Sequence, residues 1–174
     1  MGNTLPEQLP EEERGRPPLR LARVRFSDPD ARLLIDEVQD EYRILYGAPD
    51  QTPLEAEIFD PPNGAFFVGY AGGQPVATGG WRMRHDVHPW GRGTAAEIKR
   101  MYVTPAARRR GYARTVLRHL EETARQDGAE VMVLETGTAQ PDAIAMYLAE
   151  GYELVENFGY YAFSPSCRSF AKPL

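Results

Sequence analysis

A short, wholly apolar segment between two helix-forming segments places the strongest constraint on the fold of this chain. Residues 130–135 read Glu-Val-Met-Val-Leu-Glu, so four consecutive apolar residues stand between two carboxylates. A strand that is apolar at every position is typical of one covered on both faces of its sheet. Residues 112–127 before it have apolar side chains at helical spacing, and residues 141–150 after it begin with a proline and are followed by Gly151. The sequence therefore predicts a sheet with helices packed on its faces.

Further strands and helices are predicted by alternation, turn residues and caps. Residues 64–84 form a hairpin pattern around Gly72-Gly73-Gln74, and Asp28-Pro29 begins a helix that ends near Gly47. The other predicted elements are a short helix at 53–59 and strands at 19–26, 94–103, 152–155 and 160–163, with an edge strand at 168–174. We expect an α/β (α+β mixed) fold, with a mixed sheet of six to seven strands and about four helices.

Size and composition indicate one domain. The chain has 174 residues, of which residues 1–18 are polar, acidic and proline-rich, so we expect a flexible tail followed by one domain at 19–174. The formal charge of −5 argues against a general nucleic-acid binder. Cys167 is the single cysteine, which excludes an internal disulfide and favours a reducing compartment. The chain has neither a long apolar stretch nor a secretory signal pattern, so we expect a cytoplasmic protein that does not enter a membrane.

A basic turn joins the predicted strand 94–103 to the helix that follows it. It reads Arg108-Arg109-Arg110-Gly111-Tyr112-Ala113. The start of a helix has unpaired backbone N–H groups and a positive dipole end, which suit a phosphate or diphosphate. Gly111 would let the backbone approach an anion closely. Taken alone, the same turn could be a solvated basic surface, and the glycine patterns of Rossmann and P-loop sites are absent.

Two motifs on either side of the segment 130–135 resemble one family. Arg108-x-x-Gly111-x-Ala113 is similar to the Gln/Arg-x-x-Gly-x-Gly/Ala diphosphate loop of the GNAT superfamily of N-acetyltransferases, and Met101-Tyr102-Val103-Thr104-Pro105 precedes it as in that family. Gln140-x-x-Ala143-x-x-x-Tyr147-x-x-x-Gly151-Tyr152 resembles the family's later helix, with Gln140 where many members have asparagine. The resemblance covers most of the chain from about residue 19, and its specific part is 97–152.

The resemblance implies a GNAT-like fold and acetyl-CoA as co-substrate, with no metal. The sheet would be mostly antiparallel and splayed between its fourth and fifth strands, with a bulge in the fourth that frees backbone groups for the pantetheine arm. A backbone N–H near Val103 could polarise the thioester carbonyl. The residues implied to bind the co-substrate are Met101, Tyr102, Val103, Arg108, Arg109, Arg110, Gly111, Tyr112, Ala113 and Gln140.

Two catalytic residues are expected from the same resemblance. Tyr147 would be the general acid that protonates the departing thiolate, although a core tyrosine would fit the same helix. Glu97, eleven residues before Arg108, would be the general base that takes the proton of the amine; a salt-bridged strand residue beside Lys99 and Arg100 is the alternative. Glu135, at the end of its strand, is a second candidate base, and a water could also serve.

Other polar and aromatic residues are weaker candidates. Trp81, Arg82 and Arg84 are expected on the strand that faces the acceptor, where an arginine could bind a substrate carboxylate or simply be solvated. Tyr160 and Tyr161 could line the acceptor cleft or belong to the core. His85, Asp86 and His88 lie in a Pro/Gly loop and are expected to be solvated rather than to bind a metal.

The function implied is transfer of the acetyl group of acetyl-CoA to a primary amine, by direct attack in a ternary complex. The acceptor, a small molecule or a peptide amine, is not readable from any motif, and a homodimer through the late strands is possible. A non-catalytic acyl-CoA-binding regulatory domain on the same fold is the main alternative. A nucleic-acid binder using the basic residues of 99–118 is disfavoured by the acidic total charge.

Overall fold

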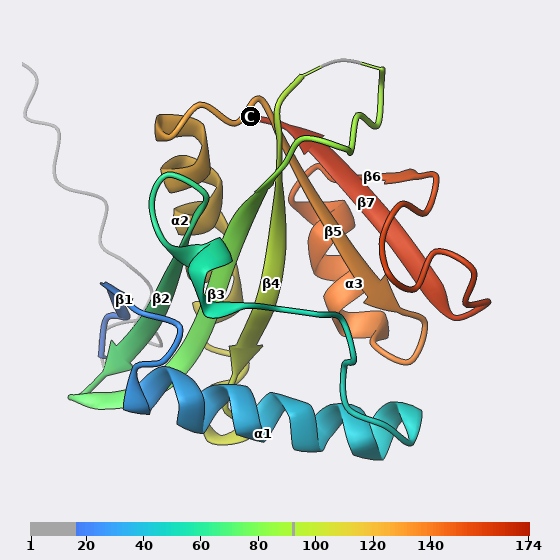
Figure 1. Ribbon diagram of the computed structural model, residues 1–174. Helices are drawn as coiled ribbons and strands as arrows, with labels where there is room; N and C mark the ends of the chain where they lie inside the picture. Colours follow the sequence, from blue (N-terminus) through green and yellow to red (C-terminus); the bar gives the residue numbers. More distant parts are fainter. Residues whose placement is uncertain (1–16, 92) are drawn as a thin grey trace, which may run out of the picture.

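A seven-stranded sheet forms the centre of the molecule (Figure 1). The computed structural model describes residues 17–91 and 93–174. The strand order is β1-β2-β3-β4-β5-β7-β6; β4 and β5 run parallel, and the other neighbouring pairs are antiparallel. The strands are β1 Arg20–Val24, β2 Gly64–Ala71, β3 Gln74–Arg84, β4 Ala95–Val103, β5 Val131–Gly137, β6 Glu153–Val155 and β7 Cys167–Pro173. The predicted mixed sheet and the hairpin turn at residues 72–73 are confirmed.

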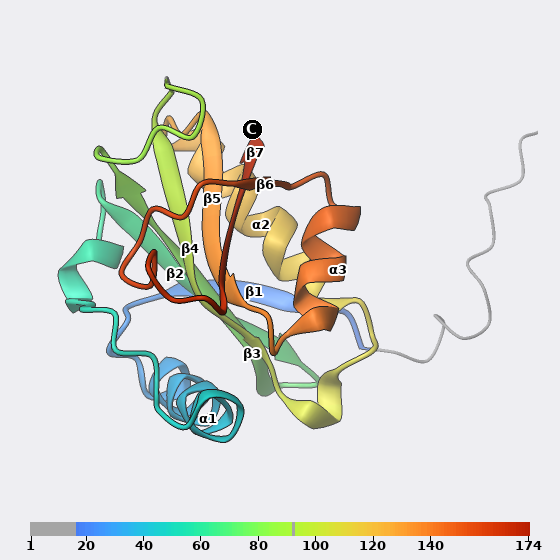
Figure 2. The ribbon, with the colours of Figure 1, turned by 90° about the vertical axis from the view of Figure 1, so that its right-hand side faces the viewer.

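The helices cover both faces of the sheet. Helix α1 (Pro29–Tyr46) lies on one face, and α2 (Tyr112–Gln126) and α3 (Pro141–Ala149) lie on the other (Figures 1 and 2). No helix among the described residues is long and apolar enough to cross a membrane. The arrangement agrees with the prediction that the apolar strand after α2 is covered on both sides, since Val131 to Leu134 are all buried.

Helix α1 begins and ends where its sequence predicts. The side chain of Asp28 accepts hydrogen bonds from the backbone N–H groups of Asp30 (2.9 Å) and Ala31 (3.4 Å), and Pro29 occupies the first turn. At the other end Gly47 has φ 77° and donates its N–H to the carbonyl oxygen of Arg43. This left-handed residue stops the helix beside the sheet opening.

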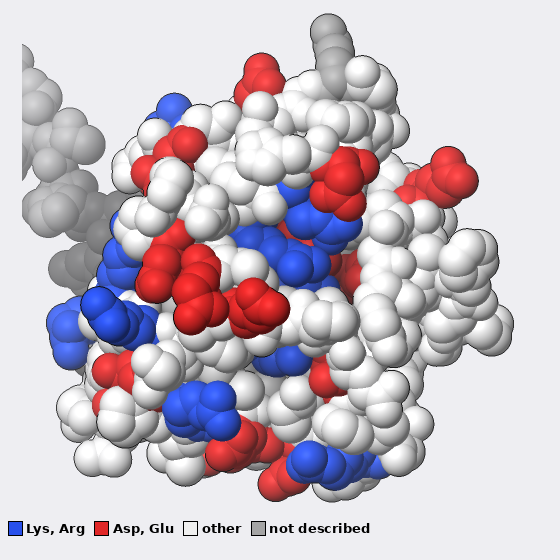
Figure 3. All heavy atoms as spheres, in the orientation of Figure 1, with Lys and Arg blue, Asp and Glu red and all other residues white. Residues whose placement is uncertain are grey.

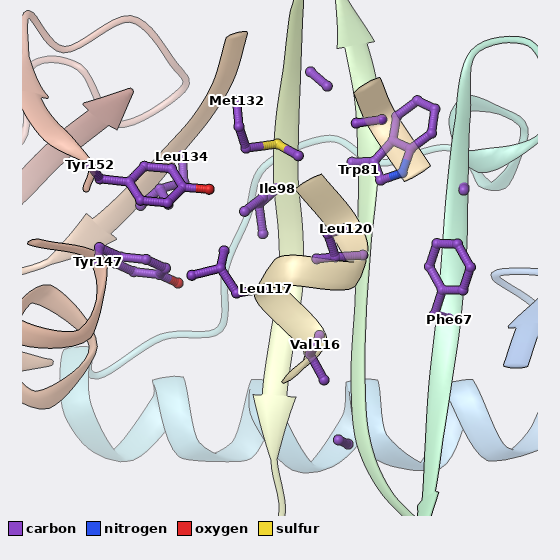
Figure 4. Packing of buried hydrophobic residues seen from close by; sticks show 14 of the residues in the cluster. Phe67, Trp81, Ile98, Val116, Leu117, Leu120, Met132, Leu134, Tyr147 and Tyr152 are labelled. Atoms are coloured by element: carbon purple, nitrogen blue, oxygen red, sulfur yellow. The ribbon is translucent and has the colours of Figure 1, made fainter. Parts of the chain in front are cut away.

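Alternate residues of the strands divide the core into two layers. Phe67, Trp81 and Ile98 pack with Leu117 and Leu120 of α2 on one face (Figure 4). Phe66, which precedes Phe67, and Tyr102 of β4 pack against α1 on the other face. Each fully buried side chain of this size contributes roughly 1.5–3 kcal/mol to stability, so both helices are firmly held.

The parallel pair at the centre of the sheet separates part-way along its length. Only Ala95–Glu97 of β4 pairs with Val131–Val133 of β5. Further along, β4 pairs with β3 alone and contains one extra residue between Lys99, opposite Gly80, and Tyr102, opposite Thr78. Arg100 lies in this bulge with φ 54°. Both the splay between the fourth and fifth strands and the bulge are confirmed.

Three details differ from the prediction. The described residues form three α-helices rather than about four, because 53–59 contains only a 3₁₀ turn, Ala56–Phe59, which is too short to nucleate an α-helix before the prolines at 61 and 62. Residues 160–163 form turns instead of a strand. The last strand is not at the edge: β7 lies between β5 and β6, where it buries Phe170 and satisfies the free edge of β5.

The predicted tail, residues 1–18, lies almost wholly outside the described residues.

Candidate active site

Two adjoining cavities open where β4 and β5 separate. A cleft of about 890 Å³ follows the gap between these strands to the turn before α2 and is bounded by α3. A second cavity of about 320 Å³ lies between the end of α1, residues 48–52, the end of β5 and residues 161–167; below we call it the acceptor pocket. Both cavities are lined by Tyr42, Asp50, Lys99, Glu135, Thr136 and Gln140. These shared residues mark the junction of the two spaces.

The turn before α2 presents free backbone N–H groups to the cleft. Within the described residues, no protein acceptor pairs with the N–H groups of residues 109–114. Gly111 (φ 79°) and Arg109 (φ 61°) both adopt left-handed backbone conformations, which turn successive N–H groups outward at the helix start. Free donors together with the positive end of α2 fit a diphosphate, as the sequence motif implies.

Arg108 differs from the two arginines that follow it. Its backbone N–H donates to the carbonyl oxygen of Pro105 (3.3 Å), and its Nε donates to that of Val103 (2.9 Å). Its guanidinium also forms an ion pair with Glu41 of α1. Arg108 therefore ties the turn to β4 and α1. Arg109, which is exposed, lines the cleft, and Arg110 follows it as an exposed residue of the same turn.

Two further residues with implied co-substrate roles are also engaged in the protein. Tyr112 is buried and donates its hydroxyl to the carbonyl oxygen of Pro17 (2.6 Å), so only its backbone faces the turn. Gln140, at the start of α3, accepts a hydrogen bond from the hydroxyl of Tyr46 (3.1 Å). This bond joins the end of α1 to α3 across the opening of the sheet.

Tyr147 lies in the wall of the cleft. It is on α3, is 7% exposed, and packs edge-on against Tyr152 with ring centroids 5.6 Å apart. Figure 4 shows its hydroxyl pointing from α3 toward Leu117 of α2. Burial raises the pKa of Tyr147, with a smaller contribution from the nearby Tyr42, so its phenol is protonated at neutral pH and can donate.

Glu97 is fully buried within a cluster of cations. Its Oε2 accepts hydrogen bonds from Arg82 (Nε, 2.8 Å) and Arg84 (Nη1, 2.6 Å), and Nζ of Lys99 lies 2.8 Å from its Oε1. Figure 3 shows Lys and Arg side chains gathered over β3 and β4 with carboxylates between them. Burial opposes the charged form, but the charges of Lys99, Arg82 and Arg84 outweigh it and hold the pKa of Glu97 below its ordinary value. This environment stabilises the charged carboxylate of Glu97.

Glu135 has the opposite environment. Nζ of Lys99 is 4.0 Å from its Oε2, and that oxygen is buried without a hydrogen-bond partner among the described residues. Its Oε1 accepts the backbone N–H of Gly159 (3.1 Å). Burial raises the pKa of Glu135, and the nearby negative charge of Glu97 adds to this, while Lys99 partly opposes it. A carboxylate with a raised pKa at the junction of two cavities has the properties of a general base.

Several residues of the site have no signal in the sequence pattern. Asp50 lies in the loop after α1 and forms an ion pair with Arg100 of the bulge. Gly159 lies directly against the carboxylate of Glu135, where a Cβ would overlap it. Tyr42 has the helical spacing of a core residue, so its place at the junction is set by where α1 crosses the sheet.

The weaker candidates fall in different places. Trp81 is not on the acceptor side: it is buried under α2 and donates its indole N–H to Thr123 (3.0 Å), because residue 81 and the arginines at 82 and 84 alternate across the strand. Tyr161 lines the acceptor pocket, whereas Tyr160 is half-exposed and packs against it. In the loop after β3, Asp86 pairs with Arg84, and His88 lies 3.0 Å from the carbonyl oxygen of Gly93.

Comparison with known proteins defines the class. Residues 32–152 match the sequence description of the acetyltransferase (GNAT) family. The chain therefore belongs to this family and is an acetyl-CoA-dependent N-acetyltransferase.

Individual relatives agree with this assignment. The chain is 31% identical over 141 residues to a protein of Azospirillum brasilense named "IAA acetyltransferase", covering 81% of this chain and 88% of the relative. A solved structure of a putative acyl-CoA N-acyltransferase from Klebsiella pneumoniae superposes with a TM-score of 0.72 at 25% identity, covering 90% of this chain and 97% of that one. An aminoglycoside N-acetyltransferase in complex with CoA shares the fold, with a TM-score of 0.61 at 19% identity over 85% of this chain and 95% of that one.

Proposed function

We propose that this enzyme acetylates a primary amine by direct attack in a ternary complex, with Glu135 as the general base and Tyr147 as the general acid. The observation that carries the proposal is the position of Glu135: its incompletely paired carboxylate lies where the cleft and the acceptor pocket meet. An amine entering from the pocket would meet this carboxylate beside the cleft.

The cleft would hold acetyl-CoA, which supplies the acetyl group as a thioester. The free N–H groups of residues 109–114 would bind its diphosphate, with Arg109 and Arg110 adding charge. The bulged part of β4, Met101 to Val103, would contact the pantetheine arm, and Gln140 would lie near its end. Arg108 would act indirectly by holding the turn in shape, since its side chain is already bonded to Val103 and Glu41.

The proton transfers follow from the two ionisable groups at the junction. A protonated amine has no lone pair for attack, so Glu135 would accept its proton directly or through a water. The nitrogen then forms the new C–N bond as the C–S bond breaks. Tyr147 would donate its phenolic proton to the departing sulfur, which leaves free CoA. The second proton that the nitrogen loses to become a neutral amide would return to the Tyr147 phenolate. Glu97, the base expected from the family resemblance, would instead hold Lys99 and the β3 arginines in place, because those cations lower its pKa.

A thiol-release assay with acetyl-CoA and a panel of amines tests the proposal. Tyr147→Phe keeps the ring against Tyr152 but removes the acid, so kcat should fall by about 10²-fold with little change in acetyl-CoA affinity measured by calorimetry. Tyr152→Phe is the matched control: its hydroxyl donates to Glu121 (2.9 Å) outside the cleft, so kcat should stay near wild type.

Two outcomes would count against the proposal in different ways. Wild-type turnover by Tyr147→Phe would remove the acid assignment. Acetyl-CoA binding without turnover of any amine would favour the non-catalytic binding domain instead.

A further inference from the structure

The lining of the acceptor pocket restricts the amine that can enter it. At about 320 Å³, the pocket is at the small end of the range of about 300–1,000 Å³ that small-molecule sites occupy. Its walls include the rings of Tyr42, Tyr46 and Tyr161 and the hydroxyls of Ser164 and Ser166. The space therefore suits a compact molecule with a polar or aromatic body.

The charges around the pocket favour a cation and disfavour an anion. Asp50 and Glu135 are its acidic lining residues, and among the lining residues, all of which the structure describes, Lys99 is the one lysine or arginine. Its ammonium group is 2.8 Å from Glu97 and 4.0 Å from Glu135, so it already has carboxylate partners. Arg100, behind the lining, is paired with Asp50. No cation of the lining is thus left to receive a carboxylate of the substrate.

Because the lining has no unpaired cation, the position of Glu135 disfavours α-amino acids as acceptors. In an α-amino acid the carboxylate carbon is two bonds from the amine nitrogen, so an amine placed at Glu135 would bring its own carboxylate next to a like charge. Because the Glu135 side chain is buried, water screens its charge less than in bulk solution, and two like charges so close together repel each other. A primary amine without that carboxylate keeps the attraction between its ammonium group and Glu135 and loses the repulsion.

From this lining we propose that the acceptor is a compact, cationic primary amine that bears no carboxylate next to its amino group. The inference rests on the proposed function, because it takes Glu135 as the group that receives the amine. The inference predicts that the pocket selects amines for two reasons: Glu135 attracts the ammonium group, and the lining has no unpaired cation to bind a substrate carboxylate.

Matched pairs of amines test the inference directly. Tyramine and tyrosine, histamine and histidine, and agmatine and arginine differ by a single carboxylate. With acetyl-CoA in the thiol-release assay, the decarboxylated member of the best-used pair should have kcat/KM at least about tenfold higher. Equal or better use of the amino acids would overturn the inference and leave the proposed function standing. Better use of a peptide with the same amino-terminal residue would also overturn it, because the acceptor would not be compact. If no amine supported thiol release, the proposed function itself would be ruled out.

A charge added to the lining provides the complementary test. Ser166→Arg places a guanidinium in the wall of the pocket, and the preference within each pair should move by about tenfold toward the amino acid. Ser166→Gln adds a similar bulk without charge and should leave the ratio within a pair unchanged. Thermal melting of both variants checks that they are folded. An unchanged ratio in folded Ser166→Arg would overturn the claim that a missing cation sets the preference.

Discussion

The paired and splayed halves of β4 and β5 differ in how far the charges and hydrogen-bonding groups in them are paired. In the paired half, Glu97 is buried at the last strand–strand contact, and three cations compensate its charge. In the splayed half, Glu135 is only partly compensated, and the turn beyond β4 has free backbone N–H groups. Both glutamates have Lys99 as a neighbour, and burial raises the pKa of each. At Glu97 the charges of Lys99, Arg82 and Arg84 outweigh burial, whereas at Glu135 Lys99 only partly opposes it. Removing one partner of a compensated buried charge destabilises a fold, while an incompletely compensated charge is available for chemistry.

The largest expected effect is the difference in kcat between variants of the two glutamates. Glu135→Gln removes the proposed base and should lower kcat by about 10³-fold, because general base catalysis is worth about 10²–10⁴-fold. Glu97→Gln, the matched change in the paired half, should lower kcat by less than about tenfold. Steady-state kinetics at the pH optimum measures both. A larger loss in Glu97→Gln than in Glu135→Gln would return the base role to Glu97.

The next largest effect concerns stability, where the change at Glu97 should be more harmful than the change at Glu135. Glu97→Gln leaves Arg82, Arg84 and Lys99 without their shared carboxylate, so the free energy of unfolding should fall by about 3 kcal/mol. Glu135→Gln removes a buried, weakly paired charge and should change it by less than about 1 kcal/mol. Urea unfolding of the two variants gives the comparison. Similar losses in both would mean that the two halves do not differ as described.

A glycine tests whether the position of Glu135 matters as well as its chemistry. Gly159→Ala would push the carboxylate away, because the new Cβ would overlap it. Since the end of a glutamate side chain can move cheaply, stability should change by less than about 1 kcal/mol while kcat falls by about tenfold. Kinetics and thermal melting on one preparation measure both quantities. Gly69→Ala is a control for the substitution itself, because Gly69 does not line either cavity and the atoms nearest to the new Cβ would be methyl groups of Leu19 and Ala77.

The smallest effect is a shift in the pH profile. Because the base must be deprotonated and the pKa of Glu135 is raised, kcat/KM should fall as the pH drops through a midpoint above the ordinary glutamate value. Glu97→Gln removes a negative neighbour, which lowers the pKa of Glu135 and should move this midpoint to lower pH by less than about one unit. Lys99→Met removes a positive neighbour and should move it to higher pH. With the same amine in every assay, titration of the substrate affects all the enzymes equally and does not change the difference between their midpoints. Shifts of the same sign in both variants would contradict the electrostatic coupling through Lys99.

Much of the fold and part of the site were predictable, for local reasons. The cap at Asp28, the stop at Gly47 and the hairpin turn depend on neighbouring residues, so short sequence patterns were sufficient to predict them. The turn at residues 108–113 was predictable because free N–H groups at a helix start are a local property. The strand predicted at 160–163 was wrong because the same aromatic residues can line a pocket from a turn.

Apart from the elements predicted at 53–59 and 160–163, the sequence by itself determined the order of strands and helices, the apolar strand covered on both faces, and the pair of motifs beside it. Only the tertiary structure decided which glutamate has its charge compensated by three cations and which has an incompletely paired carboxylate at the junction of the two cavities. That decision depends on the β3–β4 register, which places Arg82 opposite Glu97, and on the contact of Gly159 with Glu135 across 24 residues of sequence. A pKa reflects the charges and water around a group in three dimensions, and these are set by distant segments that no local pattern encodes.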